Sequence, residues 1–251
     1  WSSDTFSVTE HSLQSPVDDE EREMQASANA DFGDFDSETD AVEYITNSLM
    51  LGHEKTVSDL VRDTGTYPVD NVLTLAGTLQ WSDYTSGDSD PVQDIRNASD
   101  VLWRSIRRRP NTLVFSYDAW AKIENHPVVV DRFKNFTLTK LDAFRELTGF
   151  VGQILIAESA YNAAQNIDAT EDITDLWGQD VWLGVVDPAP AQRTKTFGKT
   201  FIYPYQGNAR PVDRWREESR KSDLFRVSWR YDLKVVSSAA GFLIVDAVEA
   251  P

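Results

Sequence analysis

The stretch Phe225-Arg226-Val227-Ser228-Trp229-Arg230-Tyr231-Asp232-Leu233-Lys234-Val235 alternates apolar and polar side chains without a break. Side chains of a β-strand point alternately to its two faces, so this pattern predicts one strand with an apolar and a polar face. At about 3.3 Å per residue it spans about 36 Å, whereas a typical strand has about five or six residues. We therefore expect an unusually long strand, and we expect residues 242–245 to return beside it as a final strand.

A helix of similar reach is predicted over residues 36–64. Ser37-Glu38-Thr39-Asp40 resembles a capping box that starts the helix. Apolar residues then recur at helical spacing: Val42, Ile45, Leu49, Val57 and Leu60. About 28 residues at about 1.5 Å each span about 40 Å, so the helix matches the strand in length. Laid side by side, the two would form an elongated, shallow domain suited to assembly, with His53 as a packing or interface residue.

Shorter elements alternate elsewhere and predict a compact α+β fold. A strand is expected over residues 72–81, and a helix from Asp90-Pro91 to the helix-breaking Pro110. Residues 1–35 are polar and acidic with isolated apolar positions, so we interpret them as an extended arm. Further strands are expected over residues 112–115, 150–157, 180–186 and 196–203.

Composition excludes several classes of function. The chain has 251 residues, with 41 Asp and Glu against 24 Lys and Arg, a net charge of −17. Residues 1–70 hold 17 of the acids and 3 of the bases, so most of the negative charge is local. This balance argues against tight nucleic-acid binding, which depends on Lys and Arg contacts to phosphates. The apolar runs are far shorter than the roughly 20 residues of a membrane helix, so we expect a soluble protein without a membrane span.

The sequence also carries no recognisable catalytic or metal-binding motif. It has no cysteine and three widely spaced histidines, which argues against thiolate chemistry, disulfides and Cys- or His-rich metal sites. Gly198-Lys199-Thr200 resembles the end of a phosphate-binding loop, but Arg193 stands where that loop requires glycine. We therefore expect no catalytic residue, no cofactor and no metal, and the protein is not predicted to be an enzyme. A carbohydrate-active enzyme with paired carboxylates and aromatic residues stays as a remote alternative.

Two charged groups are candidate contacts between subunits. Basic residues crowd the end of the helix before Pro110: Arg104, Arg107, Arg108 and Arg109. They could offset the negative end of the helix dipole or contact the acidic surface of a neighbour. The acidic run holds Asp18, Asp19, Glu20 and Glu21, which lack the alternate spacing and central glycine of a calcium loop. We interpret this run as a solvated or interface charge cluster.

Several segments in fixed order resemble a family of tailed-bacteriophage major capsid proteins. The central one runs from Arg109-Pro110-Asn111-Thr112-Leu113-Val114 through Trp120 to His126-Pro127 and Asp131-Arg132. Other matching segments are Val17-Asp18-Asp19-Glu20, Leu60-Val61-Arg62-Asp63, Leu75-Ala76-Gly77-Thr78-Leu79-Gln80-Trp81, Asp90-Pro91-Val92-Gln93-Asp94-Ile95, Tyr161-Asn162-Ala163-Ala164, Trp177-Gly178, Thr196-Phe197-Gly198-Lys199-Thr200-Phe201 and Val227-Ser228-Trp229. The resemblance extends over nearly the whole chain.

This resemblance implies an HK97-like capsid fold. Residues 16–91 and 213–251 would form its peripheral domain, with a long spine helix over about 36–64, and residues 92–212 its axial domain. Residues 1–15 would be a remnant of the extended loop, whose outgoing strand and N-terminal arm would lie upstream. Because the chain starts at Trp1 and not at Met, we expect a processed or truncated product.

The resemblance also implies the function of a major capsid protein. Pentamers and hexamers of the chain would self-assemble into the icosahedral head shell enclosing double-stranded phage DNA, with only nonspecific proximity to that DNA. The implied location is the virion, after assembly in the host bacterial cytoplasm. Implied partners are a portal and decoration or scaffold proteins, with no membrane. The alternative within the same fold is an encapsulin-like compartment shell, which differs in its cargo.

Overall fold

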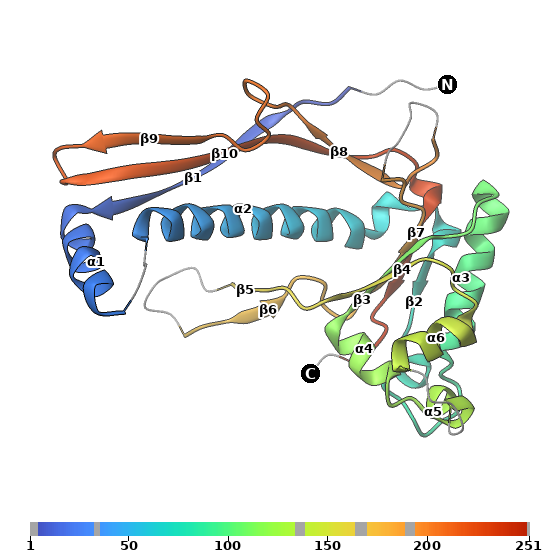
Figure 1. The fold of residues 1–251 in the computed structure, drawn as a ribbon. Coiled ribbons are helices and arrows are strands. Elements are labelled where there is room, and N and C mark those ends of the chain that lie inside the picture. Colours follow the sequence, from blue (N-terminus) through green and yellow to red (C-terminus); the bar gives the residue numbers. More distant parts are fainter. Residues whose placement is uncertain (1–4, 33–35, 134–138, 164–169, 189–193, 250–251) are drawn as a thin grey trace. The chain divides into compact units, whose positions relative to one another are not determined.

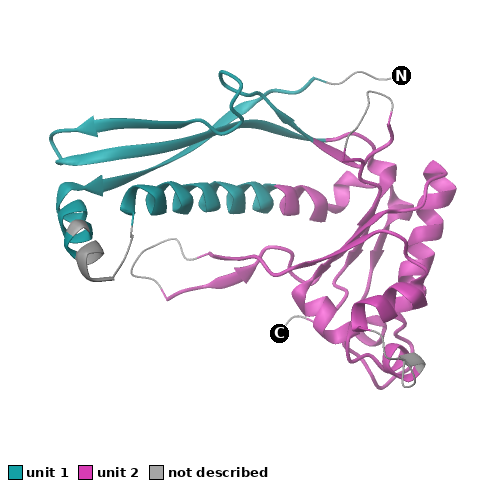
Figure 2. Ribbon diagram, in the orientation of Figure 1, with its two compact units in different colours: residues 1–56, 200–234 teal, residues 57–199, 235–251 magenta. Residues whose placement is uncertain are grey.

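A computed structural model describes residues 5–32, 36–133, 139–163, 170–188 and 194–249 (Figure 1). The chain forms two compact units, residues 1–56 with 200–234 and residues 57–199 with 235–251 (Figure 2). Both units combine helices and strands, so the predicted α+β class is confirmed. The predicted peripheral domain includes residues 57–91 and 235–251, which belong to the second compact unit.

The first unit is built around the long strand β10 (Ser222–Val235). This strand has 14 residues and contains the whole segment that was predicted from its alternating pattern. Strands β1 (Thr9–Asp18) and β9 (Val212–Glu217) pair with it in antiparallel fashion, and β8 (Gly198–Ile202) also belongs to this sheet. Consequently β10 is the central strand to which the rest of the sheet is joined.

Helix α2 (Ser37–Arg62) is the long helix predicted over residues 36–64 and has 26 residues. Its Ile45 and Leu49 form one buried cluster with Val17 of β1 and with Phe225 and Val227 of β10. The apolar stripe of the helix therefore covers the apolar face of the sheet. Burial of such side chains contributes roughly 25 cal/mol for each Å² of apolar surface removed from water.

The outer edge of β1 has no partner strand among the described residues. The Asp19 N–H donates to the Lys221 carbonyl, 3.1 Å away. This bond shows which residues of β1 form the hydrogen-bonded pairs with β10. Odd-numbered residues of β1 therefore bond to β10, and even-numbered residues direct their backbone groups to the open edge. Pro16 is one of these and has no N–H to donate.

The interpretation of residues 1–35 as an extended arm is wrong for its second half. Residues of α1 (Asp19–Phe32) form a helix of 14 residues, with Asp19, Glu20 and Glu21 in its first turn. Acidic residues there interact favourably with the positive end of the helix dipole. The helix has no regular apolar stripe, which is why the periodicity did not reveal it. The first half is extended, but as the paired strand β1, whose Val17 is buried.

The second unit contains a five-stranded sheet with the order β2-β11-β7-β3-β4. Its strands are β2 (Val72–Thr74), β3 (Thr112–Ser116), β4 (Gln153–Ala157), β7 (Val181–Gly184) and β11 (Gly241–Val245). The helices of this unit are α3 (Pro91–Ile106), α4 (Tyr117–Ile123), α5 (Pro127–Phe133) and α6 (Lys140–Thr148). A separate pair, β5 (Ala160–Asn162) and β6 (Ile173–Asp175), forms a two-stranded sheet.

Aromatic side chains fill the centre of the second unit. Phe115 of β3, Trp120 of α4 and Phe144 of α6 contact one another, with ring centroids 5.5 to 5.9 Å apart. Trp81 is fully buried, and its Nε1–H donates to Asp94 at 2.9 Å, which satisfies the one polar atom of the ring. Burial raises the pKa of this carboxyl group. These contacts hold α3, α4 and α6 against one face of the sheet.

Two predicted strands differ from the structure. The strand expected over residues 72–81 ends at Thr74, and Gly77, with a positive φ of 59°, begins a short 3₁₀ turn within the predicted range. The final strand, expected to lie beside residues 225–235, instead pairs with β2 and β7 in the other sheet. Its residues Phe242, Leu243 and Ile244 are all buried, as expected for a strand covered on both faces. Among the described residues, no helix has the length and apolar character needed to cross a bilayer.

Replacing Phe144 with alanine tests the importance of this aromatic centre. Phe144 is fully buried, so Phe144→Ala is expected to lower the free energy of unfolding by about 3–5 kcal/mol. Tyr44→Ala, at a side chain that is 70% exposed, is the matched control and should change it by less than about 0.5 kcal/mol. Urea unfolding followed by tryptophan fluorescence measures both, and equal midpoints would contradict the assignment of this core.

Candidate functional site

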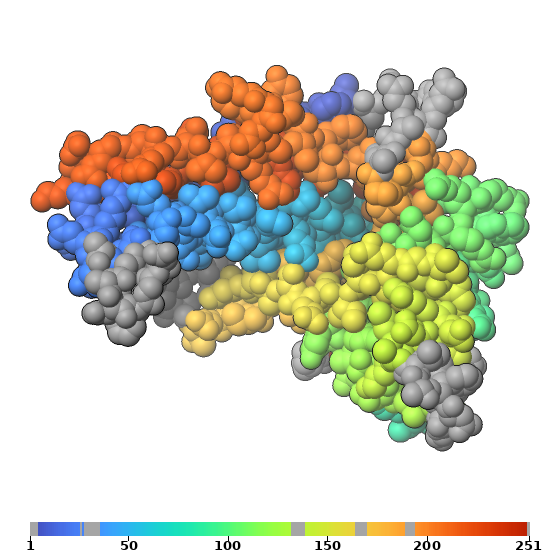
Figure 3. Space-filling model, in the orientation of Figure 1, coloured from blue at the N-terminus to red at the C-terminus, as the bar shows by residue number. Residues whose placement is uncertain are grey.

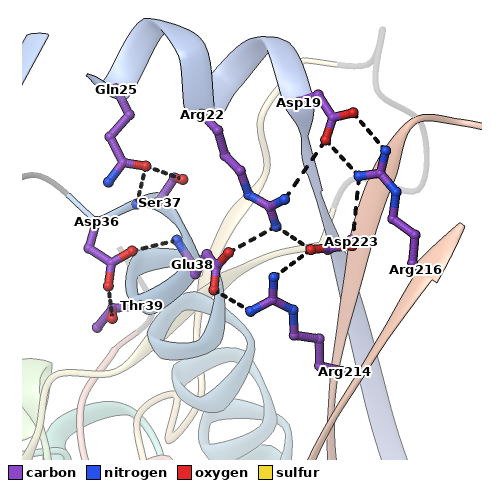
Figure 4. A network of polar contacts seen from close by, with 10 residues as sticks. All are labelled: Asp19, Arg22, Gln25, Asp36, Ser37, Glu38, Thr39, Arg214, Arg216 and Asp223. Atoms are coloured by element: carbon purple, nitrogen blue, oxygen red, sulfur yellow. Dashed lines mark hydrogen bonds and ion pairs between the residues drawn. The ribbon is translucent and has the colours of Figure 1, made fainter. Parts of the chain in front are cut away.

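A network of arginines and carboxylates joins four segments of the first unit (Figure 4). The segments are the start of α1, the start of α2, and strands β9 and β10. The charged members of the network are Asp19, Arg22, Glu38, Arg214, Arg216 and Asp223. Three positive and three negative groups balance each other, so the network has no net charge.

Asp223 lies at the centre of this network, and its side chain is only 9% exposed. Its carboxylate accepts hydrogen bonds from Arg22 at 2.6 Å and from Arg214 at 2.5 Å. Mainly because of the Arg214 hydrogen bond, the pKa of Asp223 is below its ordinary value of 3.8. The same two arginines also bind Glu38, at 2.9 and 2.8 Å, so α2 is tied to α1 and to the β9–β10 hairpin.

Asp19, one of the candidate contact residues, is bound within its own chain. Both of its carboxylate oxygens accept hydrogen bonds of 2.6 Å from Arg216. This bidentate pairing lowers the pKa of Asp19 and raises that of Arg216. Asp18, Glu20 and Glu21 are exposed, and none of them has an ion pair in the part of the chain that the structure describes. The acidic run thus divides into one structural residue and three that face solvent.

The arginines at the end of α3 have contacts of different strength. The helix stops at Arg107, which adopts a left-handed backbone with φ of 58°. Arg109 pairs with Asp100 at 2.8 Å, and Arg108 donates to the Lys195 carbonyl at 3.0 Å. Arg104 lies in the last turn of the helix, where a positive charge is favourable. All four side chains are exposed, so they remain candidates for contacts outside the chain.

Asn111 explains one of the motifs on which the family resemblance rests. Its side-chain amide donates to the Val186 carbonyl at 2.7 Å and accepts from the Val186 N–H at 2.8 Å. The backbone carbonyl of Asn111 also accepts a hydrogen bond from the Gln153 N–H at 2.8 Å. Gly152 lies so close that a Cβ there would be 2.3 Å from the Asn111 carbonyl oxygen. The asparagine therefore fastens the start of β3 to segments on both sides of it.

His126 belongs to the His126-Pro127 motif of the family resemblance and has a structural role. It is buried, its Nε2 lies 3.2 Å from the Ser89 hydroxyl, and its Nδ1 accepts the Val128 N–H at 3.3 Å. Burial lowers its pKa, which favours the neutral ring that this pairing requires. His53 packs against Trp229 and Tyr231 with centroid distances of 4.7 and 4.8 Å. This agrees with the packing role expected from its place on the apolar stripe.

Gly198-Lys199-Thr200 lies in strand β8 and not in a loop before a helix, so its rejection as a phosphate-binding loop is confirmed. Within the described ranges, no group of three His, Cys, Asp or Glu side chains is placed to hold a metal ion. The charge network was missed from the sequence because its members are far apart: Arg22 and Asp223 are separated by 201 in residue number.

Known proteins provide the remaining evidence on identity. No protein-family model matches the chain. The major capsid protein of Burkholderia phage BcepMu is 29% identical over 240 residues, covering 94% of this chain and 73% of the relative. The major capsid protein of Pseudomonas phage JBD67 is 30% identical over 158 residues, covering 63% of this chain and 46% of the relative.

Solved structures agree with these sequence relatives. A phage-related protein from Bordetella bronchiseptica RB50 superposes with a TM-score of 0.82 at 27% identity, covering 98% of this chain and 78% of that one. The capsid structure of Cyanophage P-SCSP1u gives a TM-score of 0.59 at 9% identity, covering 96% and 73%. The α+β fold is therefore that of the HK97-like phage capsid proteins. The resemblance stated from the sequence motifs is confirmed: the chain is similar to major capsid proteins of phages, over 94% of its length in the case of the BcepMu protein.

The charge network predicts a dependence of stability on pH. Because the folded-state pKa values of Asp19 and Asp223 are lowered, their stabilisation is present above pH 4 and is lost as the pH falls through those values. Asp223→Asn should lower the melting temperature at pH 7 and weaken this acid dependence. Asp213→Asn serves as the control. It removes the ion pair with Arg226, and because Asp213 is more exposed than Asp223, the effect should be smaller. Identical pH profiles of the two variants and the native chain would argue against the network.

Asn111→Ala tests the fastening of β3. The change removes both side-chain hydrogen bonds to Val186, at a cost of about 0.5–1.5 kcal/mol each in unfolding free energy. Asn125→Ala is the control, since its amide makes one exposed bond to the Ala121 carbonyl in the preceding turn. Chemical denaturation of both variants measures the difference, and a loss at Asn111 no larger than that at Asn125 contradicts the role.

Proposed function

We propose that the chain is the major subunit of a phage head shell, in which pentamers and hexamers form an icosahedral container for double-stranded DNA. The observation that carries this proposal is the similarity to the BcepMu major capsid protein over 94% of the chain, together with the shared fold. Closed rings follow from head-to-tail contacts between different surfaces of identical subunits. Many repeated contacts of moderate strength then stabilise the shell by multivalency.

The proposed role is structural and not enzymatic. Its place is the virion, reached after assembly in the host bacterial cytoplasm, with a portal and scaffold or decoration proteins as further partners. The long helix α2 would serve as the spine helix of a peripheral domain, and part of the second unit would serve as the axial domain. Residues 5–15 would belong to the extended loop, while residues 1–4 lie outside the described part of the chain.

The charged candidates take part in this proposal with different weights. Arg104, Arg107 and Arg108 have no ion pair among the described residues and would face acidic groups of a neighbouring subunit. Arg109 already forms an ion pair with Asp100 of its own chain, so it would contribute less to a contact with a neighbour. The exposed acids Asp18, Glu20 and Glu21 would lie against a neighbour or the inner wall, where negative charge keeps packaged DNA from adhering. Asp19 acts through the internal network.

Expression followed by negative-stain microscopy tests the proposal. The native chain is expected to form closed shells. Replacing Arg104, Arg107 and Arg108 with alanine should weaken each subunit contact about tenfold, which corresponds to about 1.4 kcal/mol, and the yield of shells should fall. Alanine at Lys122, Lys199 and Lys234 removes the same charge elsewhere and is the matched control.

Three outcomes would count against parts of this scheme. A monomer that never assembles under any salt condition contradicts the shell function. Shells that form equally well in both triple variants contradict the arginine contacts alone. Shells filled with enzymes and free of nuclease-protected DNA would indicate a cargo compartment in place of a phage head.

A further inference from the structure

The hairpin β5–β6 of the second unit is exposed and stands apart from the main sheet. Its strands pair from Ala160 with Asp175 to Asn162 with Ile173. The pairing continues at both ends of the strands. The Leu176 N–H donates to the Ser159 backbone carbonyl at 3.0 Å, and the Ala163 N–H donates to the Asp172 backbone carbonyl at 2.7 Å. Every residue of β6 is exposed, and the hairpin lies at the molecular surface in Figure 3. Two isolated strands are marginally stable in water, so this hairpin would gain stability from a partner.

The hairpin combines one apolar side chain with negative charge. Ile173, the first residue of β6, is 63% exposed. Residues 158–163 and 170–175 include four acids and no Lys or Arg: Glu158, Glu171, Asp172 and Asp175. None of these carboxylates takes part in an ion pair that the structure describes. A fitting partner surface would therefore be basic with an apolar centre.

Such a surface exists elsewhere on the same unit. A groove of about 480 Å³ lies between α3, the end of α6 and the start of β4. Buried Ile95, Pro110 and Phe150 line its apolar part, and Val151 at its rim is 89% exposed. We call this the α3 groove. Val151 adjoins the apolar lining of the groove, so it extends an apolar patch and is not an isolated exposed side chain.

Two arginines, Arg96 and Arg109, line the α3 groove, and they belong to an arginine-rich segment. Residues 96–109 contain five arginines and one acid, Asp100. Asp100 is paired with Arg109, and the other four arginines have no ion pair in the described part of the chain. Arg96, which lines the groove, donates to the Leu147 carbonyl, and its side chain remains exposed. Arg96 thus lines the groove without an ionic partner in the described residues, and Arg104, Arg107 and Arg108 follow it in the same segment of the chain.

We propose that the hairpin β5–β6 of one copy docks into the α3 groove of a second copy. Ile173 would contact Val151 and Phe150, while Glu171 and Asp172 would face the arginines that follow Arg96. The inference rests on the proposed shell function and names the acidic partner of the arginine cluster. Within one chain the hairpin extends away from α3 (Figure 1), so its own groove is not the partner. Because the two surfaces differ, the contact is head-to-tail and can close a ring.

A cysteine pair tests the contact directly, because the chain has no native cysteine. Assembled Ile173→Cys/Val151→Cys protein is oxidised and separated on a non-reducing gel. We expect covalent dimers, trimers and larger species, whereas each single variant should stay monomeric. Val69→Cys/Ile173→Cys is the matched control, since Val69 is also in the second unit and 90% exposed. Equal cross-linking in this control, or none in the test pair, overturns the proposed contact.

Charge exchange provides an independent readout. Glu171→Lys/Asp172→Lys should weaken each contact about tenfold, equivalent to about 1.4 kcal/mol, and should therefore lower the yield of shells. Adding Arg107→Glu/Arg108→Glu in the same chain should restore the yield, because the opposite charges face each other again. If native shells form and the acidic-to-basic variant forms them equally well, the docking is wrong and the shell function stands. If the native chain forms no shells, the proposed function itself fails.

Discussion

The first unit depends on one packing constraint: an amphipathic helix must cover one face of a strand that is much longer than usual. Val17, Ile45, Leu49, Phe225 and Val227 meet this constraint from three different elements. The alternation in β10 fixes which side chains face the helix, because a slip of one residue would turn every apolar side chain outward. Strand β1 then has to follow the same register, which brings Val17 into the cluster.

Charge in this protein has two distinct uses. Asp19, Glu38 and Asp223 are neutralised by arginines from distant parts of the sequence, and these pairs fasten the ends of α1, α2 and the β9–β10 hairpin. Other charged groups, such as Glu20 in α1 and Arg104 in α3, project outward without an ionic partner in the described structure. Fixed charges of the first kind set the shape of the subunit. The second kind supplies the long-range attraction and repulsion that select a partner.

The sequence was most informative where a pattern repeats over many residues. The long strand and α2 were predicted because their apolar residues recur with periods of 2 and about 3.6. Helix α1 was missed, since its helix-forming residues carry no apolar stripe, and β11 was placed in the wrong sheet, because periodicity says nothing about which strands pair. The motif residues Asn111 and His126 could be singled out by resemblance, but their bonds to Val186 and Ser89 depend on tertiary structure. The Asp223 network lay beyond any local signal.

Pro16 has a consequence for how this chain avoids aggregation. A free strand edge is a template on which any passing extended chain can add itself, and a protein made in many copies meets such chains constantly. At Pro16 the row of outward donors on β1 is interrupted, so an incoming strand cannot bond along the whole edge. The neighbouring Asp18 and Gln14 leave that part of the edge polar. Pro16 thus limits strand addition at this part of the edge, while β1 keeps its pairing with β10.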